Sequence, residues 1–196
     1  MTKMFTENFP FVLASGSPRR KEILSVAGFD FKIISAEIDE KPNSGESDSD
    51  YPIRMACEKA GKVSAGNPGN LVIGADTIVS HRGDILGKPS NAGHALEMLT
   101  QLKADSHRVI TAVSAFLDGK ELRVFSETTE VDFYDFDSKI LKRYADSGEP
   151  MGKAGSYAIQ GIGAFLIRTI RGSFHNVVGF PIEKFIQVGL EESWLT

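Results

Sequence analysis

The segment that most limits the fold is the apolar run Leu71-Val72-Ile73-Gly74-Ala75, which ends at Asp76. A short continuous apolar run is typical of a β-strand that other elements cover on both faces. Segments with strand and helix patterns alternate along the chain, and this alternation favours an α/β fold. We therefore expect the carboxylate of Asp76 at the carboxyl end of a buried strand, where open α/β sheets bind their ligands.

Local patterns predict the other elements, with hairpin turns at Arg82-Gly83 and Asp118-Gly119. Further strands are predicted at residues 9–14, 29–35, 77–80, 84–86, 107–117, 121–133 and 164–170. Helices are predicted at residues 18–27, 52–65, 92–102, 138–145 and 181–190. Residues 148–163 are glycine-rich and irregular, and the polar residues 41–50 are typical of a mobile surface loop.

Composition narrows the class of protein. A chain of 196 residues suits one domain, residues 1–196, or two lobes that share one sheet. The net charge of -4 argues against a nucleic-acid-binding surface, which needs a basic face. Cys57 is the only cysteine, and there is neither an apolar leader nor a run long enough to cross a bilayer. We expect a cytoplasmic protein without nucleic-acid or membrane partners.

The first strand leads directly into a helix through the turn Ser15-Gly16-Ser17, with Ser17 as the predicted N-cap. The free N–H groups and the dipole of a helix N-terminus attract anions, and phosphate is the usual ligand. Arg19 and Arg20 lie in the same turn, where the dipole disfavours cations unless an anion is bound. An ordinary capped helix with two solvated arginines is the alternative at this point.

Asp76 has few structural roles open to it. Most acids at strand ends cap a helix or stabilise a turn, but Thr77-Ile78-Val79 continues with a strand pattern and leaves no helix to cap. A buried carboxylate can bind a metal or activate water, since its pKa responds to burial and to neighbouring charges.

A second acidic group, formed by Glu37, Asp39 and Glu40, follows the second predicted strand. Solvated loops explain most such groups, but a carboxylate beside a bound polyphosphate would readily hold Mg²⁺. Lys59 lies in an amphipathic helix and Lys88 follows the first hairpin. Either lysine matters only if it shares a pocket with the two arginines.

Taken together, these segments resemble the Maf family of nucleotide pyrophosphatases, formerly described as septum-formation inhibitors. The match spans almost the whole chain, with its motifs in order and at compatible spacing. The matching motifs occupy residues 13–24, 58–60, 74–79, 87–89, 147–150, 153–161 and 176–181.

The resemblance implies an elongated, twisted mixed sheet flanked by helices, in two lobes with a cleft between them. It also implies a homodimer that uses a divalent cation, Mg²⁺ or Mn²⁺. It implies Asp76 as the catalytic acid/base residue and as a metal ligand together with Glu40. The phosphate-binding residues that it implies are Ser15, Arg19, Arg20, Lys59 and Lys88.

Within the family, Asp-Thr at positions 76 and 77 and Gln at position 160 mark the branch that acts on dTTP and UTP. A sister branch that acts on 7-methyl-GTP differs at both places. The resemblance thus implies that Arg19, Thr77 and Gln160 carry substrate choice. Two positions depart from the family pattern: Gly152 replaces a frequent Asp, and Phe174 a frequent Tyr. Both departures lie in loops near the predicted site and not among its catalytic, phosphate-binding and metal-binding residues.

The expected reaction is attack of a water, deprotonated by Asp76, on the α-phosphorus of the nucleotide, with pyrophosphate leaving. Since Gln160 offers an amide donor and acceptor side by side, it can match the O4 and N3–H edge of uracil or thymine, which cytosine reverses. A structural amide that pins the glycine-rich loop is the alternative for Gln160.

Two other functions remain open from the sequence. The chain could hydrolyse other nucleotides, such as modified pyrimidine triphosphates or the methylated guanine nucleotide. It could instead be a nucleotide-binding regulator of cell division and septum formation without relevant turnover. Such a regulator would need the phosphate pocket but could dispense with Asp76, so the presence of this acid favours an enzyme.

Overall fold

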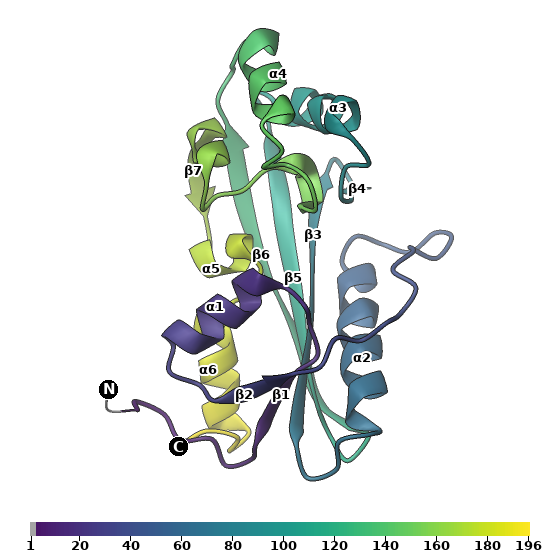
Figure 1. Cartoon of the computed structure of the whole chain (residues 1–196), viewed down its shortest axis with the longest axis vertical. Helices are drawn as coiled ribbons and strands as arrows, with labels where there is room; N and C mark the ends of the chain where they lie inside the picture. The colour runs from purple at the N-terminus through teal and green to yellow at the C-terminus, as the bar shows by residue number, and fades with distance from the viewer. Residues whose placement is uncertain (1–2) are drawn as a thin grey trace.

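One seven-stranded mixed sheet forms the frame of the molecule, for which a computed structural model describes residues 3–196. The strands are β1 (Phe11–Leu13), β2 (Phe31–Ile33), β3 (Leu71–His81), β4 (Asp84–Leu86), β5 (Ser106–Leu117), β6 (Lys120–Phe133) and β7 (Ile167–Arg171). Their order is β2-β1-β3-β5-β6-β7, with β4 paired to β3. β1 is parallel to β2 and β3, and the other pairs are antiparallel. The long strands β3, β5 and β6 give the molecule its elongated shape (Figure 1).

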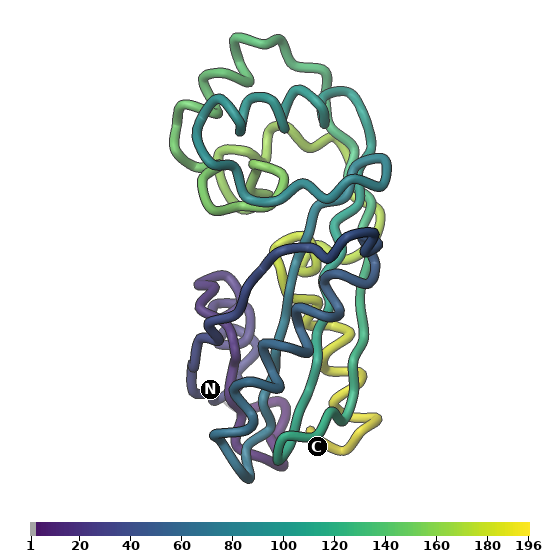
Figure 2. The backbone as a smooth tube through the Cα atoms, turned by 90° about the vertical axis from the view of Figure 1, so that its right-hand side faces the viewer, coloured from purple at the N-terminus to yellow at the C-terminus, as the bar shows by residue number. Residues whose placement is uncertain are grey.

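Helices cover this frame in two groups, one at each end (Figures 1 and 2). The α-helices are α1 (Pro18–Val26), α2 (Asp50–Ser64), α3 (Ala92–Leu102), α4 (Ser138–Asp146), α5 (Phe174–Val178) and α6 (Ile182–Glu191). Two 3-10 helices, η1 (Ala154–Ser156) and η2 (Ile162–Leu166), lie in the glycine-rich segment. No helix within residues 3–196 combines the length and the apolar character that a membrane span needs.

Each end of the sheet has its own core. In the first lobe, which contains β1 and β2, Leu13 and Ile73 pack with α1 and α6. Their neighbours Val12 and Val72 point to the opposite face and pack with α2. In the second lobe, α3, α4 and the 3-10 helices pack over the far ends of β3, β5 and β6. The predicted α/β class and the two lobes are therefore confirmed.

Gly74 on β3 fixes how close α2 lies to the sheet. A Cβ atom at this position would lie 2.2 Å from the carbonyl oxygen of Ala56, a separation that real Cβ atoms do not show. Glycine therefore permits the helix to lie directly against the strand. One turn further along α2, Lys59 is held beside Asp76, which follows Gly74 by two residues.

Three segments differ from the prediction. The runs predicted at residues 71–75 and 77–80 form one strand, β3, so Asp76 lies inside a strand and not at its carboxyl end. The strand predicted from residue 164 begins only at Ile167. The reason is Glu149, whose carboxylate accepts hydrogen bonds from the N–H groups of residues 162 and 163 at 2.8 and 2.7 Å and so stabilises the turn η2. The short helix α5 was not predicted, and the side chain of Ser173 caps it.

Candidate active site

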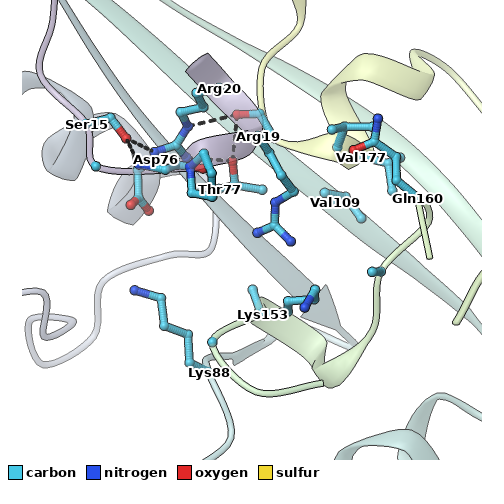
Figure 3. A pocket seen from close by; sticks show the side chains of 18 of the residues that line it. Ser15, Arg19, Arg20, Asp76, Thr77, Lys88, Val109, Lys153, Gln160 and Val177 are labelled. Atoms are coloured by element: carbon cyan, nitrogen blue, oxygen red, sulfur yellow. Dashed lines mark hydrogen bonds between the residues drawn. The ribbon is translucent and has the colours of Figure 1, made fainter. Parts of the chain in front are cut away.

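The residues that the sequence analysis selected line a single cavity of about 760 Å³. The cavity takes its walls from both lobes, and Figure 3 shows many of the side chains that point into it. Its lining includes all nine selected residues, namely Ser15, Arg19, Arg20, Glu40, Lys59, Asp76, Thr77, Lys88 and Gln160. Arg19 and Asp76 thus share one cavity, as the proposed chemistry requires.

The opening turn of α1 keeps donors free for an anion. Ser17 occupies the predicted N-cap position, and its side chain forms no capping hydrogen bond. Ser15 lies beside it, and its Oγ accepts hydrogen bonds from the Ser17 N–H at 3.3 Å and from Arg20 at 2.9 Å. Because the Ser15 oxygen accepts both bonds, its own O–H can still donate to a phosphate.

Arg20 is a rigid part of the wall. It is only 8% exposed, and its guanidinium donates to the Gly179 carbonyl at 2.9 Å, to Ser15 Oγ at 2.9 Å and to Thr77 Oγ1 at 3.0 Å. Burial lowers the pKa of this guanidinium, and the nearby carboxylate of Asp76 opposes that effect. Arg19 is bound less tightly and points into the cavity in Figure 3. Thr77 thus helps to orient the guanidinium of Arg20.

Lys59 links the two carboxylates that were predicted to bind metal. Its Nζ lies 2.7 Å from Glu40 Oε1 and 2.7 Å from Asp76 Oδ1. Lys88, from the opposite lobe, reaches the other oxygen of Glu40 at 3.2 Å. Partial burial favours the neutral form of Glu40, but the hydrogen bond from Lys59 and the two lysine charges outweigh it and hold the pKa of Glu40 below its usual value. Glu40 is therefore ionised at neutral pH.

The carboxylate pair can be tested for its fit to a divalent cation. Within residues 3–196, no three His, Cys, Asp or Glu side chains come together as a metal site. Glu40 and Asp76 nevertheless place two carboxylates around one ammonium. Since Mg²⁺ in nucleotide enzymes is commonly bound by one or two carboxylates and completed by substrate phosphates and water, the pair fits a cation that a nucleotide helps to hold.

The far end of the cavity is apolar except for Gln160. Val109 and Val177 line this region, and Figure 3 shows Gln160 beside Val177. The glycine-rich loop is pinned by Glu149 and by the hydroxyl of Tyr144, which accepts a hydrogen bond from the N–H of residue 158 at 3.2 Å. These groups hold the loop on both sides of Gln160.

One cation in the cavity was not selected from the sequence. Lys153 lines the wall contributed by the second lobe and lies near Arg19 (Figure 3). Burial and the charge of Arg19 lower the pKa of its ammonium group, which donates a hydrogen bond to the carbonyl of Glu149. Lys153 lies within a matching motif, but only the folded loop shows that it lines the cavity near Arg19.

Comparisons with known proteins show the family of the chain. The family model described as Maf-like protein matches residues 10–191. Proteins named dTTP/UTP pyrophosphatase from Bacillus cereus (strain AH820) and Bacillus anthracis are each 43% identical over 176 residues, which cover 90% of this chain and 92% of theirs. A nucleoside-triphosphatase / dITP/XTP pyrophosphatase from Mycobacterium abscessus superposes with a TM-score of 0.45 and 16% identity over 94% of each chain, too distant a likeness to support an argument.

Proposed function

The chain belongs to the Maf-like proteins, and from this premise we propose that it hydrolyses dTTP and UTP to the nucleoside monophosphate and pyrophosphate. One observation carries the proposal: a single cavity has a cationic end, a buried carboxylate and an apolar end with one amide. These three parts correspond to the phosphates, the reacting water and the base of a pyrimidine nucleotide.

The cationic end binds and orients the triphosphate. Arg19, Lys88 and Lys153 surround the space in front of the α1 N-terminus, and Arg20 and Ser15 supply fixed donors behind it. A triphosphate carries several negative charges that repel a nucleophile, so neutralisation and positioning are the main requirements of this reaction. The same groups stabilise the pyrophosphate as it leaves.

Asp76 takes the proton from the attacking water. Its Oδ1 is engaged by Lys59 at 2.7 Å, and Oδ2 remains for the water that attacks the α-phosphorus. A divalent cation held by Glu40, Asp76 and phosphate oxygens would neutralise charge on the phosphates. The hydrogen-bond partners of Ser15 Oγ are the Ser17 N–H and Arg20, neither of which is a base, and this supports its role as a phosphate ligand rather than a nucleophile.

The apolar end accepts the base. Val109 and Val177 offer faces for a planar ring, and Gln160 offers a donor and an acceptor for its edge. A site built to hydrogen-bond one edge pattern rejects a base that leaves its polar groups unpaired. Gln160 therefore carries the choice of uracil and thymine over cytosine, with Arg19 and Thr77 setting the position of the nucleotide.

We further propose that residues 1–196 act as one domain, because both lobes contribute to the cavity. The net charge of -4 supports a nucleotide rather than a nucleic acid as the partner. A cytoplasmic homodimer is the corresponding state, and size-exclusion chromatography with light scattering would test the oligomer.

The test is product analysis. The protein is incubated with UTP, dTTP, CTP or GTP and Mn²⁺ or Mg²⁺, and pyrophosphate and orthophosphate are measured separately. We expect pyrophosphate from UTP and dTTP, and none above background from the Asp76→Asn variant. Orthophosphate as the first product would mean attack at the γ-phosphorus. Tight UTP binding by the wild type without any product would instead support the nucleotide-binding regulator.

A further inference from the structure

The ammonium of Lys59 contacts both predicted metal ligands, Glu40 and Asp76. It lies 2.7 Å from an oxygen of Glu40 and 2.7 Å from an oxygen of Asp76, and its side chain is only 8% exposed. A divalent cation shared by the same two carboxylates would compete with this ammonium. Lys59 is therefore a charge that the cation must displace.

The local charge balance also disfavours a cation in the free protein. Two carboxylates, Glu40 and Asp76, are matched directly by Lys59 and Lys88. Arg20 adds a third positive charge near Asp76, and its own hydrogen bonds go to uncharged oxygens. A divalent cation would thus enter a cluster that already has more positive than negative charges, in a region where burial weakens screening.

A triphosphate changes this balance. It brings several negative charges to the cationic end of the cavity, and Lys59 lines the same cavity. The backbone of Lys59 is fixed, because α2 lies against β3 at Gly74, but four rotatable bonds let its ammonium move between the carboxylates and a phosphate. The cavity therefore offers Lys59 two anionic partners, and only one of them is always present.

We propose that Lys59 closes the metal site of the nucleotide-free protein and that the triphosphate opens it by drawing the ammonium onto phosphate oxygens. The metal then binds together with the nucleotide and not before it. By reciprocity, metal and nucleotide each raise the affinity of the protein for the other. The same movement would free Asp76 Oδ1 when the substrate is in place. This inference rests on the proposed function, because the anion that moves Lys59 is the substrate.

The test measures Mn²⁺ binding without turnover, from the loss of the free Mn²⁺ signal in electron paramagnetic resonance. In the absence of nucleotide, Lys59→Met should bind Mn²⁺ at least ~10-fold more tightly than the wild type, since it leaves two carboxylates with one fewer cation. Lys88→Met removes an equal charge from the same Glu40, but its side chain is 62% exposed, so water and salt already screen it. We expect the Mn²⁺ affinity of this control variant to rise by less than ~3-fold.

Two further measurements complete the test. Asp76→Asn in the Lys59→Met background should remove the gained Mn²⁺ binding, which locates the ion at these carboxylates. The wild type should bind α,β-methylene-UTP at least ~10-fold more tightly with Mn²⁺ than without it. Lys59→Gln, which keeps a polar end, replaces Lys59→Met if circular dichroism shows that the methionine variant does not fold.

Equal Mn²⁺ affinities of the nucleotide-free wild type and the folded Lys59 variant would overturn the proposal. So would tight Mn²⁺ binding to the nucleotide-free wild type that Asp76→Asn abolishes, or nucleotide binding that is indifferent to Mn²⁺. None of these readouts depends on hydrolysis. Failure of the proposed function would instead appear as the absence of pyrophosphate from UTP and dTTP.

Discussion

Arg54 and Glu46 form a two-point ion pair, with Nε to Oε1 at 2.6 Å and Nη2 to Oε2 at 2.7 Å. The same guanidinium donates to the carbonyl of Lys41 at 3.0 Å, and Tyr51 donates to the carbonyl of Glu40 at 2.8 Å. Both anchors come from α2, so the loop that carries Glu40 is fixed to the helix that carries Lys59.

Arg54→Gln should therefore lower the catalytic rate, although Arg54 is not one of the residues that line the cavity. The loop of Glu40 loses its bidentate anchor, and a small displacement of a positioned group reduces kcat strongly. We expect kcat for UTP to fall at least ~10-fold and KM to change less than ~3-fold, because the phosphate-binding arginines are intact. Arg143→Gln, on the exposed surface of α4, is the control and should keep both constants. A wild-type kcat in Arg54→Gln would show that the ion pair of Arg54 and Glu46 does not contribute to catalysis.

The sequence was most informative where contacts are local or follow from strand order. Ser15 follows β1, whose parallel pairing with β3 ends at Leu13 and Ile73, and Asp76 lies within β3 just beyond that point. The alternation of strands and helices was therefore enough to bring them together. Lys59 could be placed only on the resemblance, because no local pattern says which face of a helix meets a carboxylate.

Contacts between distant segments were not predictable. Arg20 binds the carbonyl of Gly179, which lies 159 residues away in the sequence. This contact depends on α5, a five-residue helix too short to give a periodic signal. Lys153 and the turn η2 depend in the same way on Glu149, whose role inside an irregular segment has no sequence signature. Irregular loops are fixed by such individual side chains, and sequence patterns do not record them.

Asp76→Asn should nearly abolish turnover and leave nucleotide binding. The amide keeps the shape of the side chain but cannot accept a proton from water, and general base catalysis contributes about 10²–10⁴-fold. We expect kcat for UTP to fall within or beyond this range. Without a divalent cation, calorimetry with α,β-methylene-UTP should show a dissociation constant within a few-fold of the wild type. A fully active variant would exclude Asp76 as the base.

Gln160→Glu should reduce the preference for uracil and thymine. The substitution removes the amide donor and places a negative charge at the apolar end of the cavity. We expect the ratio of kcat/KM for UTP to that for CTP to fall at least ~10-fold. Gln101→Glu, an exposed position on α3 outside the cavity lining, makes the same change of charge and should keep the ratio. An unchanged ratio in Gln160→Glu would assign the amide to structure.

His107 should make stability depend on pH. Its Nε2 lies 2.8 Å from the hydroxyl of Tyr157, which lines the cavity, and burial lowers the pKa of the imidazole from 6.5 to about 3. Between these values the unfolded chain binds a proton that the folded protein does not, so stability is complete above pH 6.5 and falls as the pH drops toward 3. The loss approaches about 1.4 kcal/mol per pH unit in this window.

Urea unfolding of the wild type and His107→Gln between pH 4.5 and 7.5 would measure this contribution, since the difference between the two slopes isolates one histidine. His94→Gln, at a more accessible site on α3, makes the same substitution outside the core and is the control. If the free energy of unfolding depends on pH equally in the wild type and in His107→Gln, this buried imidazole does not control acid stability.

Gly155 should tolerate alanine less well than Gly152, although both adopt left-handed backbone conformations, with φ of +66° and +74°. A Cβ at Gly155 would lie 2.8 Å from Cγ2 of Val79 on β3, whereas a Cβ at Gly152 would meet nothing within 4 Å. Gly152→Ala therefore measures the backbone strain alone, about 1–2 kcal/mol. Gly155→Ala adds the clash with Val79, and we expect a further loss of about 1–3 kcal/mol.

The two glycine variants should also differ in function. Gly155 lies between Lys153 and Gln160, so a backbone that moves away from Val79 shifts a phosphate-site cation and the base-reading amide together. Gly155→Ala should raise KM for UTP as well as lower the midpoint of urea unfolding, and both changes should exceed those of Gly152→Ala, at a position that also lines the cavity. If the two variants unfold at the same urea concentration, the contact between η1 and β3 is not what holds this wall of the cavity in place.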